Sequence, residues 1–466
     1  MAPESHKSAE ASGSALKKPM TRRDFLKVAG MAGAAVGATG GLGGIVAACG
    51  GGGGGGGTSS GRAIKVGFVT PLTGQIATFG QLDQYCVDRW KEAVKDGIAT
   101  ADGVTHPIEF IVKDSQSDSN RAATVAQDLI QNDGVDVMMV ASTPDTVVPV
   151  AQMAESLNVP CVSNDCPWQP YYFGPQKDPA NPVDFKWSYH AFWGLEDVTA
   201  VFTGIWNQLD TNKLIGEMWP NDADGIGWSD KKTGQPPMLE AAGYKFISTG
   251  LYSNDTSDFT PQISKFKSAG VDLVSGVFVP PAFVNFWKQA YQQSLRPKMV
   301  TVGKALLFPA EMEAIGSIGY GLTTECWWSP SHPFTSSLSG ETCQQLADDW
   351  TKRKGKEWAQ PLLHYAVFEV VADALKRTQN VDDKESILAA IVDTDIQSIA
   401  GRITWKAGAP LNPVKNVCRT VLVGGMWVKG TQYPFELLLA DTSHAKEAPF
   451  NVDIPENGKV APLTYA

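Results

Sequence analysis

The sequence lacks the residue patterns that most enzymes and metal sites require. Its six histidines are scattered, no CxxC or HExxH motif occurs, and no GxSxG motif lies between a predicted strand and a predicted helix. The acidic loop Asn221–Asp230 carries three aspartates, but their spacing does not match a calcium loop and no glutamate closes it. We therefore expect no catalytic residues, no metal and no cofactor.

Long, strongly apolar runs are also missing. The least polar segment, Val28–Ala48, has 21 residues, of which seven are Gly and seven are Ala. These are too many small residues for an ordinary membrane-spanning helix. Two adjacent arginines, Arg22 and Arg23, precede it. This order is typical of a twin-arginine export signal, so residues 1–48 are interpreted as a signal peptide outside the fold.

The signal ends at a single cysteine. Small residues lead to Cys49 and resemble a lipobox, where a bacterial lipoprotein is cut and acylated; an ordinary signal-peptidase site is the alternative. Eight glycines follow, and residues 49–61 read as a flexible tether. We expect twin-arginine export and lipid anchoring at Cys49 to the outer face of the cytoplasmic membrane.

Positive charge is scarce in the remaining chain. Without residues 1–48, 33 Lys and Arg face 46 Asp and Glu, a formal charge of −13. An acidic surface repels phosphate backbones, so nucleic acid is excluded as a partner. The 405 residues from Arg62 onward are too many for one core and predict two lobes of similar size.

Cysteine is sparse as well. Six cysteines remain beyond Cys49, and an exported chain permits them to form disulfides. Cys326 and Cys343 bracket a loop rich in Ser, Pro and Gly and form our candidate bridge, whereas Cys86 lies on the apolar stripe of a predicted helix and is interpreted as a buried thiol.

Short apolar runs rich in β-branched residues alternate with segments of helical spacing. The first series of runs is 64–70, 108–114, 135–140 and 159–163, and a second series follows at 213–218, 244–249, 271–279 and 297–302. Strands that alternate with helices predict parallel sheets covered on both faces. The fold class is therefore α/β, with two Rossmann-like lobes joined by a hinge.

The repeated series also suggests domain boundaries. We assign residues 62–188 to the N-lobe, 189–324 to the C-lobe, 325–400 to helices that return to the N-lobe, and 401–466 to closing strands of the C-lobe and a tail. Ligands of open α/β sheets bind at the carboxyl ends of strands. Two facing lobes would place their binding loops in one cleft.

These segments resemble a known family. The stretch "IKVGFVTPLTGQIATFG", the stretch "VDVMMVASTPDTVVPVAQMAESLNVPCVS" and the closing "GRITW" are similar to the type I periplasmic binding proteins, in particular to the leucine/isoleucine/valine-binding receptors of ABC importers. The resemblance runs from about Ile64 to Trp427. It implies a hinged receptor that captures a small-molecule solute and hands it to ABC permease subunits in the membrane, and we expect a monomer.

The resemblance also implies ligand-binding positions in the cleft loops. By loop they are Phe79 in the first; Ser142, Thr143 and Thr146 in the second; Asp165, Cys166 and Trp168 in the third; and Asp224, Phe278, Pro280 and Lys304 in the C-lobe. Six further tryptophans, Trp187, Trp193, Trp219, Trp228, Trp327 and Trp328, fall near the expected hinges or cleft loops.

Departures from the family pattern bear on the ligand. Pro144 replaces a residue with an amide donor, and Lys304 stands where amino-acid receptors place an acid. Trp168 belongs to a cluster of four rings in six residues, which suits a ligand wall. The sequence thus favours an apolar or aromatic solute with a carboxylate. A branched-chain amino-acid receptor, a sensory module for a signalling partner and an enzyme are the alternatives.

Overall fold

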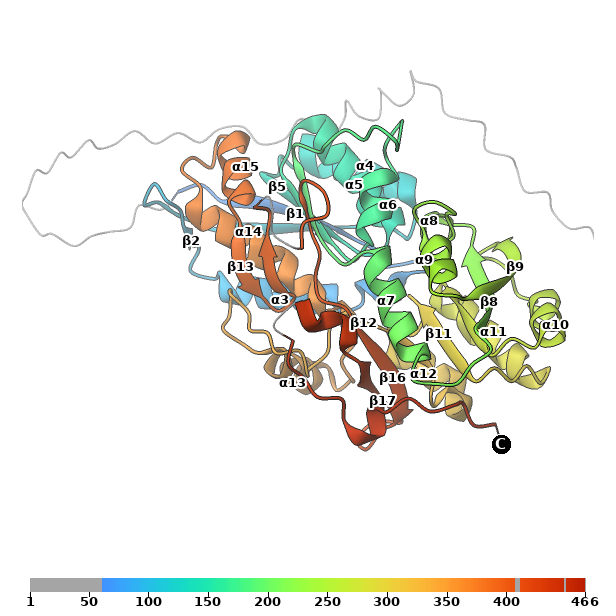
Figure 1. The fold of residues 1–466 in the computed structure, drawn as a ribbon. Coiled ribbons are helices and arrows are strands. Elements are labelled where there is room, and N and C mark those ends of the chain that lie inside the picture. The colour runs from blue at the N-terminus through green and yellow to red at the C-terminus, as the bar shows by residue number, and fades with distance from the viewer. Residues whose placement is uncertain (1–60, 407–410, 448–449, 466) are drawn as a thin grey trace, which may run out of the picture. The chain divides into compact units, whose positions relative to one another are not determined.

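The computed structural model describes residues 61–406, 411–447 and 450–465. The signal, Cys49 and the glycine tract lie outside the described residues. The described chain forms two lobes, each built around one sheet (Figure 1). Within it, no helix is both long and apolar enough to cross a membrane.

The N-lobe contains a six-stranded, fully parallel sheet. Its strands lie in the order β15, β7, β6, β5, β1 and β4. Their bounds are β1 (Ile64–Thr70), β4 (Ile108–Asp114), β5 (Val137–Ala141), β6 (Cys161–Asn164), β7 (Ser188–Ala191) and β15 (Val417–Cys418). Two small antiparallel hairpins accompany it, β2 (Ile98–Ala99) with β3 (Thr105–His106), and β13 (Asp395–Ser398) with β14 (Gly401–Thr404).

Helices cover both faces of this sheet. They are α2 (Ala77–Gly80), α3 (Asp83–Ala93), α4 (Ser119–Gln131), α5 (Pro144–Leu157), α6 (Trp168–Phe173), α13 (Cys343–Lys354), α14 (Tyr365–Arg377) and α15 (Lys384–Val392), with the 3-10 turn η2 (Gln360–His364) before α14. Alternate strand residues supply the two faces: Phe68 and Met139 pack with α3 and α14, whereas Val69 and Met138 pack with α4 and α5. This alternation follows from the period of two along a strand.

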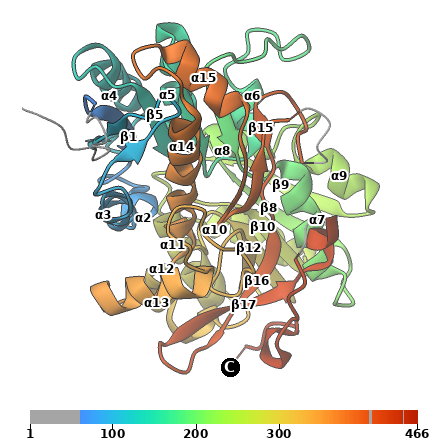
Figure 2. The ribbon, with the colours of Figure 1, turned by 90° about the vertical axis from the view of Figure 1, so that its left-hand side faces the viewer.

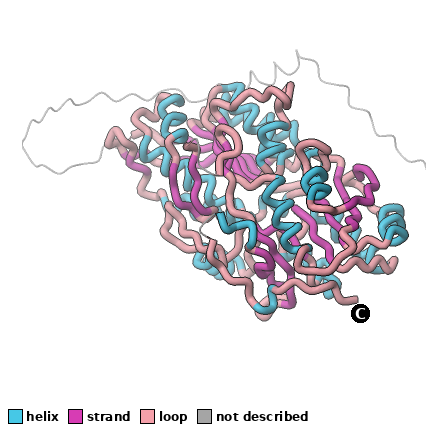
Figure 3. The backbone as a smooth tube through the Cα atoms, in the orientation of Figure 1, coloured by secondary structure: helices cyan, strands magenta, loops and turns pink. Residues whose placement is uncertain are grey.

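The C-lobe contains a seven-stranded mixed sheet in the order β17, β16, β12, β11, β10, β8 and β9, in which β16 runs antiparallel to both of its neighbours, β12 and β17. The strands are β8 (Leu214–Pro220), β9 (Lys245–Tyr252), β10 (Leu273–Val277), β11 (Met299–Gly303), β12 (Thr323–Cys326), β16 (Val423–Lys429) and β17 (Phe435–Asp441). The helices are α7 (Leu195–Trp206), α8 (Ala223–Trp228), α9 (Gln235–Ala241), α10 (Thr260–Ala269), α11 (Pro280–Gln292) and α12 (Pro309–Ile315), with 3-10 turns η1 (Gly316–Gly319), η3 (Ser443–Glu447) and η4 (Glu456–Gly458). Helices flank the strands of both lobes in Figure 3.

The chain passes between the lobes three times, through residues 192–194, 327–342 and 419–422. The second crossing returns it to the N-lobe, so α14 lies beside α3 and β2 from the start of the chain (Figure 2). Strands β14 and β15, which the sequence assigns to the C-lobe, lie with the N-lobe because β14 pairs with β13 and β15 pairs with β7. The partner of a short strand cannot be inferred from its own residues.

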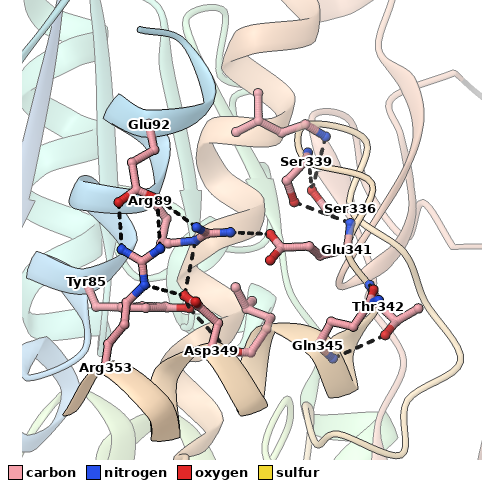
Figure 4. A network of polar contacts seen from close by, with 12 residues as sticks. Tyr85, Arg89, Glu92, Ser336, Ser339, Glu341, Thr342, Gln345, Asp349 and Arg353 are labelled. Carbon is pink, nitrogen blue, oxygen red and sulfur yellow. Dashed lines mark hydrogen bonds and ion pairs between the residues drawn. The ribbon is translucent and has the colours of Figure 1, made fainter.

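A polar network fastens the returning helix α13 to α3 (Figure 4). Arg353 contacts Glu92 at 2.6 Å and Asp349 at 2.7 Å, and Arg89 contacts Glu341 at 2.5 Å. Tyr85 donates a hydrogen bond to Asp349 at 2.8 Å. Single exposed ion pairs contribute little, but charges shared between two helices in this way fix their mutual position.

The expected disulfide is not formed. Each of the six cysteines that the structure describes is a free, buried thiol. Cys326 lies at the end of β12 and its sulfur contacts the carbonyl of Trp328, whereas Cys343 begins α13 and contacts the carbonyl of Ile399. The two sulfurs therefore point to different backbone partners, and the loop between them is held without a covalent bridge.

We predict that a chain beginning after Cys49 will show almost no reactive thiol toward a thiol-specific reagent in its native state, because burial raises the pKa of thiols such as Cys326 and Cys418. Unfolding in guanidinium without reductant should expose all six. Two fewer thiols in the unfolded, unreduced sample would show that a bridge exists.

Candidate functional site

A small cavity lies between the lobes, at the carboxyl ends of their parallel strands. Its volume is about 30 Å³, the space of a single water molecule. Both lobes and two of the crossing segments contribute to its wall. The lining residues are Phe79, Thr143, Pro144, Asp165, Pro167, Phe192, Trp193, Asp224, Trp228, Val277, Lys304, Leu307, Glu325 and Trp327. We call this space the inner cavity.

Three residues at this edge have left-handed backbone conformations. Ser142 (φ 127°), Asp165 (φ 58°) and Lys304 (φ 68°) each directly follow a strand, β5, β6 and β11 respectively. Residues other than glycine pay about 1–3 kcal/mol for such positions, and they persist where the surroundings require them. Because of this conformation, the side chain of each residue points in a different direction from the one it would have if the strand continued. Two of these side chains, those of Asp165 and Lys304, line the inner cavity.

Aromatic rings form the wall near the crossings. Phe192 packs edge-on against Trp327 at 5.2 Å, and Trp193 packs edge-on against Trp228 at 6.0 Å. Phe79 of the N-lobe meets Phe308 of the C-lobe edge-on at 5.0 Å. Each pair joins residues of different lobes or crossing segments. The rings therefore hold the lobes against each other and also limit the size and shape of what the cavity can bind.

A buried ion pair occupies the C-lobe side. The Lys304 ammonium lies 2.6 Å from Asp224 and 3.6 Å from Asp222. Burial opposes the charge of Lys304, but the neighbouring carboxylates raise its pKa overall. Burial raises the pKa of Asp224 to about 7 in spite of Lys304. The one ammonium of the inner cavity wall is therefore already bonded to protein carboxylates.

Two more carboxyl groups surround this pair. Glu325 accepts a hydrogen bond from the backbone of Lys304 at 2.8 Å, and burial raises the pKa of Glu325 to about 8. Asp145, next to Pro144 in α5, is the second, and burial raises its pKa although the nearby Lys304 lowers it. Acidic groups thus outnumber basic ones around the inner cavity.

The N-lobe side is anchored by a chain of buried polar groups. Thr70 donates to Asp83, Asp83 bonds the Nδ1 atom of His364 at 2.6 Å, and the Nε2 atom of His364 bonds Asp165 at 2.8 Å. Burial alone would lower the pKa of His364, but the two carboxylates raise it to about 10. His364 is therefore an imidazolium that holds Asp165 at the cavity wall.

Several buried polar atoms at the site have no hydrogen-bond partner among the described residues. They are the hydroxyl oxygens of Ser142 and Thr143 and the indole nitrogens of Trp193 and Trp228. Buried polar groups in native proteins are almost always bonded, and an orphan at a cavity indicates a missing ligand or water. Thr143, Trp193 and Trp228 line the inner cavity itself.

The structure brings part of the sequence-predicted set together. Phe79, Thr143, Asp165, Asp224 and Lys304 line the inner cavity, and Ser142 is buried directly beside Thr143. The others lie behind the wall. Thr146 is buried in the first turn of α5, Pro280 begins α11, and the backbone carbonyl of Cys166 accepts a hydrogen bond from His190.

Two predicted aromatic residues are engaged elsewhere. Trp168 donates its indole N–H to Glu196 at 2.8 Å and packs against Phe173, so its ring lies against the start of α7. Phe278 packs among rings of the C-lobe core, including Phe283 and Phe286, each at 5.2 Å. Neither ring lines the inner cavity.

Other residues of the wall were not predicted from the sequence. Phe192, Glu325, Leu307 and Pro167 line the inner cavity without having been singled out. For Glu325 a signal existed, because it is an acid two residues before the tryptophan pair Trp327–Trp328 at the predicted hinge. No comparable signal marks Leu307.

We predict that His364→Gln lowers the free energy of unfolding by about 3–5 kcal/mol, because it leaves Asp83 and Asp165 facing each other without a buried cation. The folded-state pKa of His364, about 10, lies above its ordinary 6.5. Its stabilisation is therefore complete below pH 6.5 and fades as the pH rises toward 10. Urea denaturation of both proteins between pH 6 and 10 measures this difference.

His332→Gln is the matched control. His332 is also buried, bonds Ser329 at 2.9 Å, and has its pKa lowered to about 3 by burial. It is neutral throughout that range, so the cost of its substitution should not change with pH. A cost of His364→Gln that is equally flat would mean that His364 is neutral.

Comparisons with known proteins agree with this architecture. A family model described as periplasmic binding protein matches residues 63–414, and a model of the twin-arginine translocation signal matches residues 19–43. The similar solved structures include a leucine-binding protein, LivK, from Thermotoga maritima. It is 17% identical, with 80% of this chain and 97% of that chain aligned and a TM-score of 0.66.

Two other structures carry bound ligands. A branched-chain amino acid receptor, LivJ, from Streptococcus pneumoniae in complex with isoleucine is 15% identical, with 81% of this chain and 99% of that chain aligned and a TM-score of 0.62. A solute-binding protein from Rhodopseudomonas palustris in complex with 3,4-dihydroxybenzoic acid is 20% identical, with 84% and 99% aligned and a TM-score of 0.65. Identities this low show a shared fold. With the family model covering most of its length, the chain belongs to the periplasmic binding protein family and has the type I arrangement of two lobes.

Proposed function

We propose that this protein is the extracytoplasmic receptor of an ABC-type importer, which captures a small apolar or aromatic solute between its lobes and delivers it to a permease. The observation that carries the proposal is the inner cavity, lined from both lobes by aromatic rings and by hydroxyl and indole groups without partners. The family is one of binding and transport proteins, and we infer no catalysis.

The mechanism follows from the position of the site. Phe79, Thr143 and Asp165 come from the N-lobe, and Asp224, Trp228 and Lys304 from the C-lobe. A solute between them touches both sets only when the lobes are together, so it stabilises the closed form by those extra contacts. The permease then recognises a closed, loaded receptor.

The contacts also bear on the polar group of the solute. The resemblance suggested a carboxylate, but Lys304 is already paired with Asp224 and Asp222. Pro144 occupies the first position of α5 and offers no amide donor there. Since carboxyl groups also predominate around the cavity, these contacts favour a neutral or positively charged group over a carboxylate.

A matched set of three phenyl compounds tests this choice. We expect 2-phenylacetamide or 2-phenylethylamine to raise the melting temperature of the protein more than phenylacetate, with L-leucine as the probe for a branched-chain amino-acid receptor. Deprotonation of Asp224 (pKa about 7) and Glu325 (pKa about 8) adds negative charge, so affinity for the amine should rise between pH 6 and 9.

The opposite result has a clear meaning. If phenylacetate gives the largest shift and binds more tightly at low pH, Lys304 must leave its aspartates to receive a carboxylate. If L-leucine alone stabilises the protein, the receptor is specific for branched-chain amino acids. A permease and an ATPase encoded beside this chain would favour import over a sensory role.

The location of the protein is tested separately. We propose that Cys49 is acylated and that the protein is anchored by lipid, in addition to the export that the twin-arginine signal specifies. Cys49→Ser should move the protein from the membrane fraction to the soluble fraction of cells, and replacing Arg22 and Arg23 by lysine should block export. A Cys49→Ser protein that stays with membranes would contradict anchoring by lipid.

A further inference from the structure

A second and much larger cavity lies outside the inner one. Its volume is about 900 Å³, and we call it the outer chamber. The N-lobe lines it through α5, α6 and the loop at residues 178–180, and the C-lobe through α8 and residues 230–233. Helix α8 packs directly against α5 and α6, so the outer chamber spans the boundary between the lobes.

The inner cavity and the outer chamber are neighbours between the lobes, and we call the two together the slot. Pro144 lines both. In α8, Asp224 and Trp228 line the inner cavity while Ala223 and Gly227 line the outer chamber. At the start of α5, the N-cap residue Thr143 lines the inner cavity and Asp145 lines the outer chamber. The partition between them is therefore no thicker than the first turns of these helices.

The two cavities differ in volume, so they suit different parts of a solute. Sites for small organic molecules measure about 300–1,000 Å³. The inner cavity, at about 30 Å³, is far below this range, whereas the outer chamber, at about 900 Å³, lies within it. An organic solute that reaches the polar groups of the inner cavity must place most of its volume elsewhere in the slot.

The wall of the outer chamber suits an apolar occupant. Four prolines, Pro144, Pro149, Pro170 and Pro179, give it a rigid surface, and Val148 and Phe173 add apolar area. Ile226 is 55% exposed on this wall, although its neighbours in α8, Gly225 and Trp228, are buried. A large aliphatic side chain left in water at a cavity between lobes marks a surface to be covered.

We propose that the outer chamber holds the apolar body of the solute while the inner cavity holds its polar group. The receptor would then select elongated amphiphilic molecules, with a chain or ring system longer than any amino-acid side chain. This inference rests on the proposed function. Because the occupant contacts α5 and α6 of one lobe and α8 of the other, its length adds to the stabilisation of the closed form.

Homologous series test the inference on the mature protein. Butyl, hexyl and octyl members of the n-alkylamines, n-alkanamides and n-alkanoates are titrated by calorimetry. In the series whose polar group fits, affinity should rise roughly fourfold with each added CH2 group. Affinity that does not change with length, while the butyl member binds, would overturn the outer chamber and leave the proposed function intact. Failure of all three series would overturn both.

Two variants place the effect in the outer chamber. Ile226→Ser should weaken binding of the octyl member about tenfold and leave the butyl member unchanged, because only the longer chain reaches this wall. Val148→Trp should place a bulky ring in the outer chamber and so weaken the dependence on length. Val392→Ser, at an aliphatic residue 44% exposed on α15, and Ser156→Trp, at an exposed position of α5, are the controls.

The melting temperatures of the unliganded variants show that they fold. A dependence on chain length that is undiminished in the Val148→Trp protein would place the apolar body elsewhere and overturn the inference. Weakening of the butyl and octyl members alike by Ile226→Ser would do the same, since it would mean that the substitution disturbs the inner cavity. In either case, a protein partner would be the remaining candidate occupant of the outer chamber.

Discussion

The buried ion pair of Lys304 with Asp224 is the interaction on which the cleft depends. Their side chains are 6% and 5% exposed, so removal of either would strand a charge in the interior. Lys304 is held twice, since its backbone N–H is bound by Glu325 and its left-handed turn directs the side chain toward α8. The charge of Lys304 therefore organises the C-lobe loops, and what remains for a solute is a surface of rings, hydroxyl groups and partly protonated carboxyl groups.

In the N-lobe, the buried carboxylates are paired with a different cation, His364. His364 reaches Asp165 from behind, through a helical turn that belongs to the returning part of the chain, and balances Asp83 on its other side. The wall residue Asp165 thus depends on a residue 199 positions later. This explains why the second crossing matters to the site: the segment that follows Trp327 also supplies Gln360, which fixes the backbone at Trp327 and Glu325.

The local sequence pattern was sufficient to predict the main strands and the α/β fold of this molecule. Residues 64–70 and 108–114 form strands with the bounds that their apolar, β-branched runs predict, and parallel strands bring their carboxyl ends to one edge. The family resemblance then named Thr143, Asp165 and Lys304 at that edge, and all three line the inner cavity. Which side chains face the cavity was not predictable in the same way. Trp168 turns toward Glu196 and Phe278 toward Phe286, and both choices depend on packing with residues distant in sequence. The pairing of β15 with β7 likewise depends on contacts that no local pattern encodes.

Pro144 shows how one residue can change the chemistry of a site while the fold stays the same. The start of a helix after a parallel strand is a ready place for an anion, because free amide groups and the helix dipole point toward it. In α5 the first amide is absent, and a rigid apolar ring faces both the inner cavity and the outer chamber. The ring of Pro144 thereby gives the partition an apolar part, over which the hydrocarbon body of the proposed solute can pass. Polar contacts then fall to Thr143 and to the carboxyl groups around Lys304, so solute length and polar-group charge are selected by separate parts of one slot.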